Sequence, residues 1–476
     1  MTAIYHTGIA HAGDKEFFMQ GLILMVGYTA VMIAVTRLFT KRQETAEGFL
    51  VADRHMGAVR SAMSIAATWI WAPALFTSAE KAYTNGTVGL FWFVVPNVLC
   101  LLFFIPYAKS IRQKMPDGIT LSGFMGKTYG RKAQGIYLFQ LTLLSVLSTG
   151  VQLLAGGKIL ATITGLPYAA MVILLAVSAY SYSQFSGIRA SVMTDVVQMV
   201  VILASCALFV PWALHTNNDA AALMRGLSGA SGEYGSLFDT KGAAVLFSFG
   251  LPTAIGLISG PFGDQCFWQR AFACEQKKIG RAFALGAVLF AVVPLSMGAL
   301  GFIAAGSGFV ASDTGVVNME LVAHLFPSWA ICVFALMLVS GLLSTVDSNL
   351  CAAASLTHDV IPDAGVKTSK VSMVLLLCAG AMIAFVPGLT VTHLFMIYGI
   401  LRATTLLPTV LTLKGKVLTD SGVFLGVLSG LVVGWPLFIY ATNTGNSALK
   451  TVGCLMAAIL PGVVSALASR KGGAGA

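Results

Sequence analysis

The sequence predicts an all-α polytopic membrane protein with about thirteen transmembrane helices. Of its 476 residues, 57% are hydrophobic and only 10% are charged, whereas about 25% charged residues are typical of soluble domains. The hydrocarbon core of a bilayer requires about 20 apolar residues per helix. Thirteen stretches meet this requirement, centred near residues 28, 69, 97, 146, 175, 203, 253, 293, 341, 380, 400, 431 and 460. An ordinary water-soluble globule is therefore excluded, and no long soluble domain remains.

The order of these stretches predicts the organisation of the chain. We expect an external tail (residues 1–16), an extra N-terminal helix (17–38) and a first helical unit (58–214). An external loop (215–241) then leads to a second helical unit (242–413), two C-terminal helices (420–469) and a cytoplasmic tail (470–476). The first sixteen residues carry Asp14, Lys15 and Glu16 rather than a basic start, which is unlike a cleavable signal. Phe17 to Arg37 is therefore expected to remain as a span.

The basic residues predict the orientation. Of the 29 Lys and Arg residues, 22 lie in loops on one side of the predicted membrane and 6 on the other, and Arg402 lies inside a span. Cytoplasmic loops carry the excess of Lys and Arg, so we expect the N-terminus outside and the C-terminus in the cytoplasm of an inner or plasma membrane protein. Membrane topology thus accounts for the net charge of +10, and we expect no nucleic-acid partner.

The chain has no motif for the chemistry of an enzyme or an ATP-driven pump. A phosphate-binding loop that ended in Gly126-Lys127-Thr128 would need glycine where Leu121 stands. The eight cysteines have no metal or disulfide spacing and suit apolar packing. We therefore expect no enzyme activity, no catalytic residue and no cofactor. Transport driven by an ion gradient needs none of these.

Two spans are interrupted in a way that predicts a transport site. Ser61 to Lys81 contains Pro73, and Ala243 to Gly263 contains Pro252 and Pro261 with several glycines. An interior proline removes a helix hydrogen bond, and irregular backbone is tolerated in a membrane where it lines a protein cavity. Two such spans, five helices apart, indicate two five-helix inverted repeats that meet at a midplane site. The alternative is that proline and glycine are simply common in membrane helices.

Polar residues on one predicted helix indicate a cation site. Ser344, Asp347 and Ser348 have the spacing that places side chains on one helix face, and Asp195 follows Thr194 in another span. Hard oxygen ligands suit a small hard cation such as sodium. The alternative is a structural polar cluster that pairs with Arg402.

Several motifs resemble the sodium/solute symporter family over roughly residues 20 to 415. Ser344 and Thr345 match a pair of hydroxyls in that family, and the other matching segments are Ala46 to Arg54, Ser186 to Arg189 with Met193 to Gln198, and Phe267 to Arg270. Within the family, the runs Trp69 to Leu75, Ala82 to Trp92 and Asp264 to Trp268 resemble the urea active transporters. Arg402 and Asp347 depart from the urea transporter pattern.

The resemblance implies a LeuT-type fold of five plus five helices and two sodium positions. The first sodium would be held by Ala66, Trp69, Gly341, Ser344 and Thr345, and a possible second one by Asp195, Ser344, Asp347 and Ser348. The side chains implied for the substrate cavity are Thr68, Trp71, Gln152, Phe247, Ser259 and Arg402. A proton could replace the second sodium ion.

Arg402 separates the candidate solutes. If it pairs with a protein aspartate, for which Asp347 and Asp195 are the candidates, we expect a neutral solute such as urea; if it faces the cavity, we expect an amino acid such as proline or a small carboxylate. A third alternative is that Arg402 only packs inside the protein. The expected partners are the solute, sodium and the lipid bilayer, and a monomer is expected to suffice. A membrane solute sensor is the alternative of another class, but no signalling segment follows Arg470.

Overall fold

The computed structural model describes residues 14–39, 45–185, 187–216, 221–361 and 364–473. These residues fold almost entirely into helices, and the one β-bridge found among them joins Met56 to Cys274. The helices of the N-terminal half are α1 (Asp14–Phe39), α2 (Ala46–Val51), η1 (Ala52–Arg54), α3 (Ala58–Trp69), α4 (Ala72–Leu75), α5 (Thr77–Lys114), α6 (Leu121–Thr128), α7 (Arg131–Thr164), α8 (Tyr168–Ser183), α9 (Gly187–Thr216), α10 (Ala221–Arg225) and η2 (Gly226–Ser228).

The C-terminal half continues with helices of the same kinds. They are α11 (Thr240–Val245), η3 (Leu246–Gly250), α12 (Leu251–Ile258), α13 (Gly260–Gly263), α14 (Gln265–Ala273), η4 (Gln276–Lys278), α15 (Ile279–Gly306), η5 (Thr314–Val316), α16 (Val317–Leu325), α17 (Ser328–Val360), α18 (Val366–Ala384), α19 (Val391–Leu413), α20 (Asp420–Ser429), η6 (Gly430–Gly434), α21 (Trp435–Asn443) and α22 (Ser447–Gly473). The predicted all-α class is confirmed.

Eleven helices of the described part are long and apolar enough to cross a membrane. Two further stretches that the sequence predicts as spans differ from these eleven: α8 is shorter, and residues 58–75 form two helices, α3 and α4. The count of thirteen spans and the inverted repeat remain predictions. The expected tails lie partly outside the described residues, because residues 1–13 and 474–476 are not described.

The first interrupted helix breaks three residues before its proline. α3 ends at Trp69, Ile70 and Trp71 leave helical geometry, and α4 begins at Ala72. Pro73 is the second residue of α4. A proline is tolerated in the first turn of a helix, where its missing N–H would have no intrahelical partner. The proline therefore marks where the helix restarts.

The second interruption lies beside the first. α12 ends at Ile258, the short α13 follows, and Asp264 is extended before α14 begins. A methyl group added at Gly260 would lie 2.3 Å from the Trp69 ring. The two breaks are thus in contact across the centre of the protein, and glycine is required where they meet.

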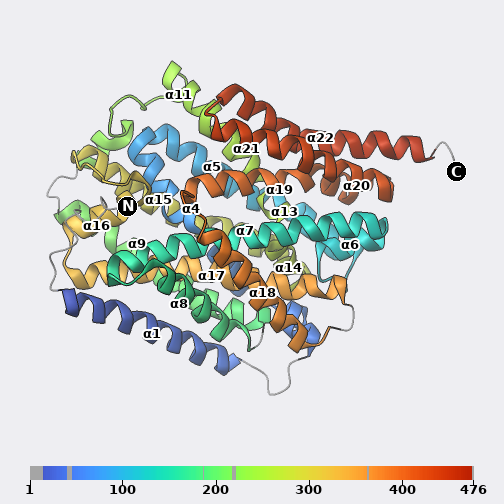
Figure 1. Ribbon diagram of the computed structural model, residues 1–476, viewed down its shortest axis with the longest axis horizontal. Helices are drawn as coiled ribbons and strands as arrows, with labels where there is room; N and C mark the ends of the chain where they lie inside the picture. Colours follow the sequence, from blue (N-terminus) through green and yellow to red (C-terminus); the bar gives the residue numbers. More distant parts are fainter. Residues whose placement is uncertain (1–13, 40–44, 186, 217–220, 362–363, 474–476) are drawn as a thin grey trace.

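The two breaks lie inside the helical bundle. Figure 1 shows α1 along one edge and α21 and α22 along the opposite edge, with α4, α7 and α17 between them. Large apolar side chains of outer helices are more than half exposed, for example Val26 of α1, Leu375 of α18 and Val432 of η6. Such a surface is appropriate for contact with lipid, whereas polar side chains are collected in the interior.

Candidate functional site

A buried ion pair lies at the centre of the bundle. Asp195 of α9 is fully buried, and Nη2 of Arg270 of α14 donates to its Oδ2 atom at 3.0 Å. The hydroxyls of Ser64 and Ser344 donate to the same carboxylate, each at 2.5 Å. Four helices, α3, α9, α14 and α17, are joined by this carboxylate. Removal of either charge would leave the other one buried and unpaired.

The guanidinium of Arg270 lies among the residues predicted for a second sodium ion. Its Nη2 atom also donates to Ser348 Oγ at 2.6 Å, and its Nε atom donates to Ser64 Oγ at 2.9 Å. Ser348 Oγ in turn lies 2.8 Å from Thr68 Oγ1. The structure therefore brings Asp195, Ser344 and Ser348 together as predicted, but it places a protein cation between them.

Asp347 of α17 is hydrogen-bonded to Thr194 rather than to Arg270 or Asp195. It is fully buried, its Oδ2 atom accepts from Thr194 Oγ1 of α9 at 3.3 Å, and the hydroxyls of Ser183 and Ser191 also lie beside the carboxylate. Its Oδ1 atom has no hydrogen-bond partner within the described residues. Within the described part, hydrogen bonds link Asp195, Ser344 and Ser348 to one another or to Arg270. Asp347, the fourth residue predicted for the second sodium ion, has no hydrogen bond to any of them.

The residues predicted for the first sodium ion lie where α17 passes the break after α3. Thr345 Oγ1 donates to Thr68 O at 3.2 Å and to Gly341 O at 3.3 Å. A methyl group at Gly341 would lie 3.2 Å from the carbonyl oxygen of Ile70, so α17 approaches the broken backbone closely. The carbonyl of Ala66 accepts a hydrogen bond from Ile70 N at 2.9 Å. Carbonyl and hydroxyl oxygens thus surround the end of α3.

Four of the residues predicted for the substrate cavity contact other parts of the protein, and their role in solute binding stays a prediction. Gln152 of α7 accepts from Ala72 N at 2.8 Å, so it caps the start of α4. Thr68 Oγ1 lies 2.8 Å from Ser348 Oγ. Ser259 Oγ donates to Ile255 O at 2.7 Å. Phe247 is 51% exposed and lies outside the buried interior. The remaining two, Trp71 and Arg402, lie together.

Arg402 of α19 is surrounded by aromatic rings. Its guanidinium carbon lies 4.5 Å from the ring centre of Tyr398 and 5.2 Å from those of Trp69 and Trp71. Its Nη2 atom donates to Asp264 Oδ2 at 3.2 Å. The partner of Arg402 is therefore a protein aspartate, but neither Asp195 nor Asp347. Asp264 also caps α14, because its Oδ1 atom accepts from Cys266 N at 3.0 Å.

Several hydrogen-bond donors around Arg402 are unused. Among the described residues, Arg402 Nε and Nη1, Trp71 Nε1 and Tyr398 OH are buried and have no partner. Buried donors normally have a partner, and each one without a partner costs about 1–3 kcal/mol. We define these three residues as the donor cluster. Its N–H groups and hydroxyl match a ligand that presents oxygen acceptors.

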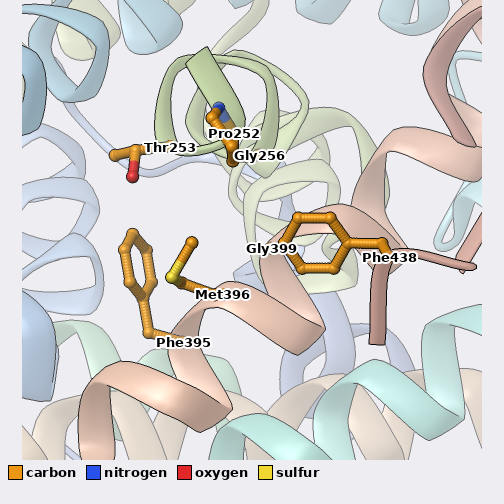
Figure 2. Close-up of a pocket in the computed structure, with 7 residues that line it drawn as sticks. All are labelled: Pro252, Thr253, Gly256, Phe395, Met396, Gly399 and Phe438. Atoms are coloured by element: carbon orange, nitrogen blue, oxygen red, sulfur yellow. The ribbon is translucent and has the colours of Figure 1, made fainter. Parts of the chain in front are cut away.

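A pocket adjoins the donor cluster between α12, α19 and α21. Its lining comprises Pro252, Thr253, Gly256, Phe395, Met396, Gly399 and Phe438. Phe395 belongs to both sites, because its ring centre lies 5.1 Å from that of Trp71. Figure 2 shows the Thr253 hydroxyl directed toward the side of the pocket that holds Phe395 and Met396. The lining is otherwise apolar, and the Thr253 hydroxyl is its polar side-chain group.

Sequence reasoning missed Arg270, Asp264 and Tyr398. Arg270 and Asp264 lie at the two ends of the same short segment, at the edge of a span rather than in its middle. One signal could have indicated Arg270: the mostly apolar segment Phe267 to Phe272 contains a cation, which needs a buried anion. Tyr398 precedes Arg402 by four residues, the spacing at which two helical side chains share a face.

The fold is similar to those of two solved membrane transporters. The model aligns with a Na+-coupled sialic acid symporter in its substrate-bound, outward-open state, with a TM-score of 0.77 at 15% identity over 94% of this chain and 97% of the other. It also aligns with Mhp1, a nucleobase-cation-symport-1 family transporter in a closed conformation, with a TM-score of 0.61 at 16% identity over 89% and 95% of the two chains.

The family follows from the sequence match. Residues 49–430 match the model of the sodium:solute symporter family, so the chain belongs to that family. The resemblance identified from the motifs is thereby confirmed. The family and the relatives described next are transporters rather than enzymes.

The relatives include urea transporters, as the sequence motifs predict. The chain is 27% identical to a probable urea active transporter of Schizosaccharomyces pombe over 60% of its length and 45% of the relative's. It is 26% identical to the urea active transporter of Saccharomyces cerevisiae over 83% and 60% of the two lengths. The chain thus spans about half the length of these relatives. A sodium/pantothenate symporter of Escherichia coli is 23% identical over 88% of this chain and 90% of that protein.

Proposed function

We propose that this protein is a sodium-coupled symporter of a small neutral polar solute, with urea as the favoured one. The observation that carries the choice of a neutral solute is the Arg402–Asp264 pair. The guanidinium charge of Arg402 is already balanced by the Asp264 carboxylate, whose Oδ2 atom lies 3.2 Å from Nη2 of the arginine. A solute carboxylate would compete with Asp264 and leave a negative charge without a partner in the bundle.

The donor cluster is suited to a carbonyl oxygen. Two N–H groups of Arg402 and one of Trp71 are available, and an uncharged amide oxygen accepts from such donors without adding charge. The aromatic rings of Trp69, Trp71 and Tyr398 exclude water from the site, since each is at most 1% exposed. Hydrogen bonds are stronger in such a dry environment. The urea transporters among the relatives support the same solute.

Sodium is proposed at the oxygen-lined end of α3, held by the carbonyls of Ala66, Trp69 and Gly341 and by the hydroxyls of Ser344 and Thr345. Among the described residues no group of three or more His, Cys, Asp or Glu could hold a metal ion. A weakly bound monovalent ion does not require such a group. Neutral oxygen ligands suit a hard cation that must be released on every cycle.

Coupling follows from the position of the two sites on one broken helix. Sodium would order the break after Trp69, and Trp71 belongs to the donor cluster two residues later. Each ligand therefore favours the conformation that the other binds, and the effect is reciprocal. We propose an external N-terminus and a cytoplasmic C-terminus, for which the membrane potential assists sodium entry by about 2.3 kcal/mol per charge per 100 mV.

A small carboxylate such as pantothenate is the second candidate. The pantothenate symporter aligns over 90% of its own length, more than the urea transporters, and two N–H groups of Arg402 could hold a carboxylate if Asp264 moved away.

The test is uptake of labelled urea, pantothenate and proline into proteoliposomes, with and without an inward sodium gradient. Sodium-dependent urea uptake that Thr345→Val reduces at least tenfold is the expected result. Accumulation of pantothenate or proline alone would replace the neutral solute with an acidic one. Solute accumulation without any dependence on sodium would contradict the symport mechanism.

A further inference from the structure

The rings around Arg402 have the arrangement of a cation-binding cage. The guanidinium carbon lies 4.5 Å from the ring centre of Tyr398 and 5.2 Å from those of Trp69 and Trp71. The face of an aromatic ring attracts a cation that lies within about 6 Å of the ring centre, and proteins use groups of such rings to bind organic cations. We define Trp69, Trp71 and Tyr398 as the aromatic cage.

A carboxylate accompanies the aromatic cage. Oδ2 of the buried Asp264 accepts from Arg402 Nη2 at 3.2 Å. Its Oδ1 atom accepts from Cys266 N at 3.0 Å, at the start of α14, and the N-terminus of a helix stabilises a negative charge. Asp264 is therefore held in place by α14 as well as by Arg402. Ring faces together with a carboxylate suit a cation that carries N–H donors, and in this protein that cation is a side chain.

The positions of the cage rings do not depend on the guanidinium. Trp69 Nε1 donates to Asn97 O at 3.2 Å, and the Trp69 ring packs edge-on against Phe267 with the ring centres 5.0 Å apart. The Trp71 ring packs edge-on against Phe395 at 5.1 Å. These contacts come from the rest of the bundle, so the aromatic cage should persist when the guanidinium is removed.

An occupied cage rejects a second cation. An organic cation that entered would meet the Arg402 charge at contact distance and would find the Asp264 carboxylate already paired. Like charges repel strongly where little water lies between them. A guanidinium ion and urea are both planar and similar in size, so shape alone does not separate them. Charge does, because a neutral solute is not repelled.

We propose that Arg402 makes the site reject organic cations by filling the aromatic cage, and that the cage with Asp264 is a latent binding site for a guanidinium-type cation. This inference rests on the proposed function, because the solute must reach the donor cluster. Arg402→Ala removes Cγ, Cδ and the guanidinium group, which together correspond to ethylguanidinium. Ethylguanidinium is therefore the cation that matches the space and the charge that this variant loses.

The first experiment measures binding to the full-length protein in detergent and requires no transport. Isothermal titration calorimetry should show that Arg402→Ala binds ethylguanidinium at least tenfold more tightly than the wild type does. Ethylurea, the neutral analogue of the same shape, should bind to Arg402→Ala at least tenfold more weakly than ethylguanidinium. Equal affinity of the two proteins for ethylguanidinium, or equal affinity of the variant for the two ligands, would overturn the proposal.

Two further variants test the carboxylate and the general loss of a positive charge. Asp264→Asn in the Arg402→Ala background should lower the affinity for ethylguanidinium at least tenfold, and an unchanged affinity would contradict the role of the carboxylate. Lys450→Ala is the matched control, because Lys450 Nζ lies 5.9 Å from the centre of a single ring, that of Phe438, and donates to the carbonyl of Ser248 rather than to a carboxylate. A gain in Lys450→Ala as large as in Arg402→Ala would overturn the proposal.

The remaining measurements cover folding and transport. If Arg402→Ala does not fold alone, recovery of folded protein with ethylguanidinium but not with ethylurea supports the proposal, and recovery with neither or equally with both contradicts it. In proteoliposomes, a tenfold excess of ethylguanidinium should leave urea uptake by the wild type unchanged, and inhibition would contradict the rejection of cations. If the wild type takes up no urea, the proposed solute fails, and the calorimetry still decides whether the cage binds a cation.

Discussion

Nη2 of Arg270 lies 3.0 Å from Oδ2 of Asp195, with both side chains at most 1% exposed. The hydroxyls of Ser64, Ser344 and Ser348 and the carbonyl oxygen of Cys266 satisfy the remaining polar atoms of the pair. An ion pair in the interior offsets the cost of its desolvation only with such additional hydrogen bonds. The pair therefore joins the broken helix α3 to α9, α14 and α17, and its stability depends on side chains from all four helices.

Loss of one partner of this pair is expected to be severe. Arg270→Gln leaves the Asp195 charge buried alone, which costs about 3–5 kcal/mol in comparable ion pairs. The double variant Arg270→Gln with Asp195→Asn removes both charges and should recover much of that loss. Thermal unfolding of the purified protein in detergent measures both effects.

The matched control is the surface pair Lys241–Glu233, which has a similar distance of 3.0 Å but half-exposed side chains. Lys241→Gln should cost at most about 1 kcal/mol. Equal destabilisation by Arg270→Gln and Lys241→Gln would show that the buried pair does not hold the helices together.

The sequence predicted the broken helices and the polar face of α17, because proline, glycine and hydroxyl spacing are local signals. It did not predict the partners of the two buried arginines. Asp195 and Arg270 are 75 residues apart, and Asp264 and Arg402 are 138 apart. A single chain contains no signal that joins such positions. The break itself lies before Pro73 rather than at it, since proline suits the first turn of the restarted helix better than its interior.

Contact between the second break and α19 should be intolerant of added volume. A methyl group at Gly263 would lie 2.8 Å from Arg402 Cα and 2.9 Å from its carbonyl oxygen, and backbone atoms cannot move aside as a flexible side chain can. Gly263→Ala is therefore expected to displace α19, lower thermal stability by about 1–3 kcal/mol and reduce uptake at least tenfold.

Gly135 of α7 provides the control, because nothing lies within 4 Å of the position of an added methyl group. Gly135→Ala should stabilise the protein by about 0.4–1 kcal/mol, since it restricts the unfolded chain. If Gly263→Ala behaved in the same way, α13 and α19 would not approach as closely as described.

The Arg402–Asp264 pair should control discrimination against anions. Asp264→Asn leaves the guanidinium uncompensated, so an anionic solute gains a full charge partner. We expect pantothenate to inhibit urea uptake at least tenfold more strongly in Asp264→Asn than in the wild type. Cys266→Ser serves as the control, because it alters the neighbouring helix start without changing charge. An unchanged preference for the neutral solute would remove Asp264 from the selectivity of the site.

The start of α6 is fastened to the bundle from two sides. Thr120 and Ser122 both donate to the carboxylate of Asp359 at the end of α17. Gln265 of α14 accepts from Leu121 N at 3.1 Å and donates to Ile119 O at 3.0 Å. Hydrogen bonds to a charged acceptor contribute about 1.5–3 kcal/mol each, so their loss should favour separation of α6 from α17.

Asp359→Ala is therefore expected to increase the alkylation rate of the buried thiols Cys266 and Cys351 at least tenfold, which mass spectrometry can follow residue by residue. The measurement requires a Cys378→Ser background, because Cys378 is exposed and reacts first. Asp313→Ala is the control, since Asp313 caps a short helix in a different loop. Sodium should slow alkylation in both variants by ordering the break after Trp69. Equal rates in Asp359→Ala and Asp313→Ala would mean that the contacts of α6 with Asp359 do not protect these thiols.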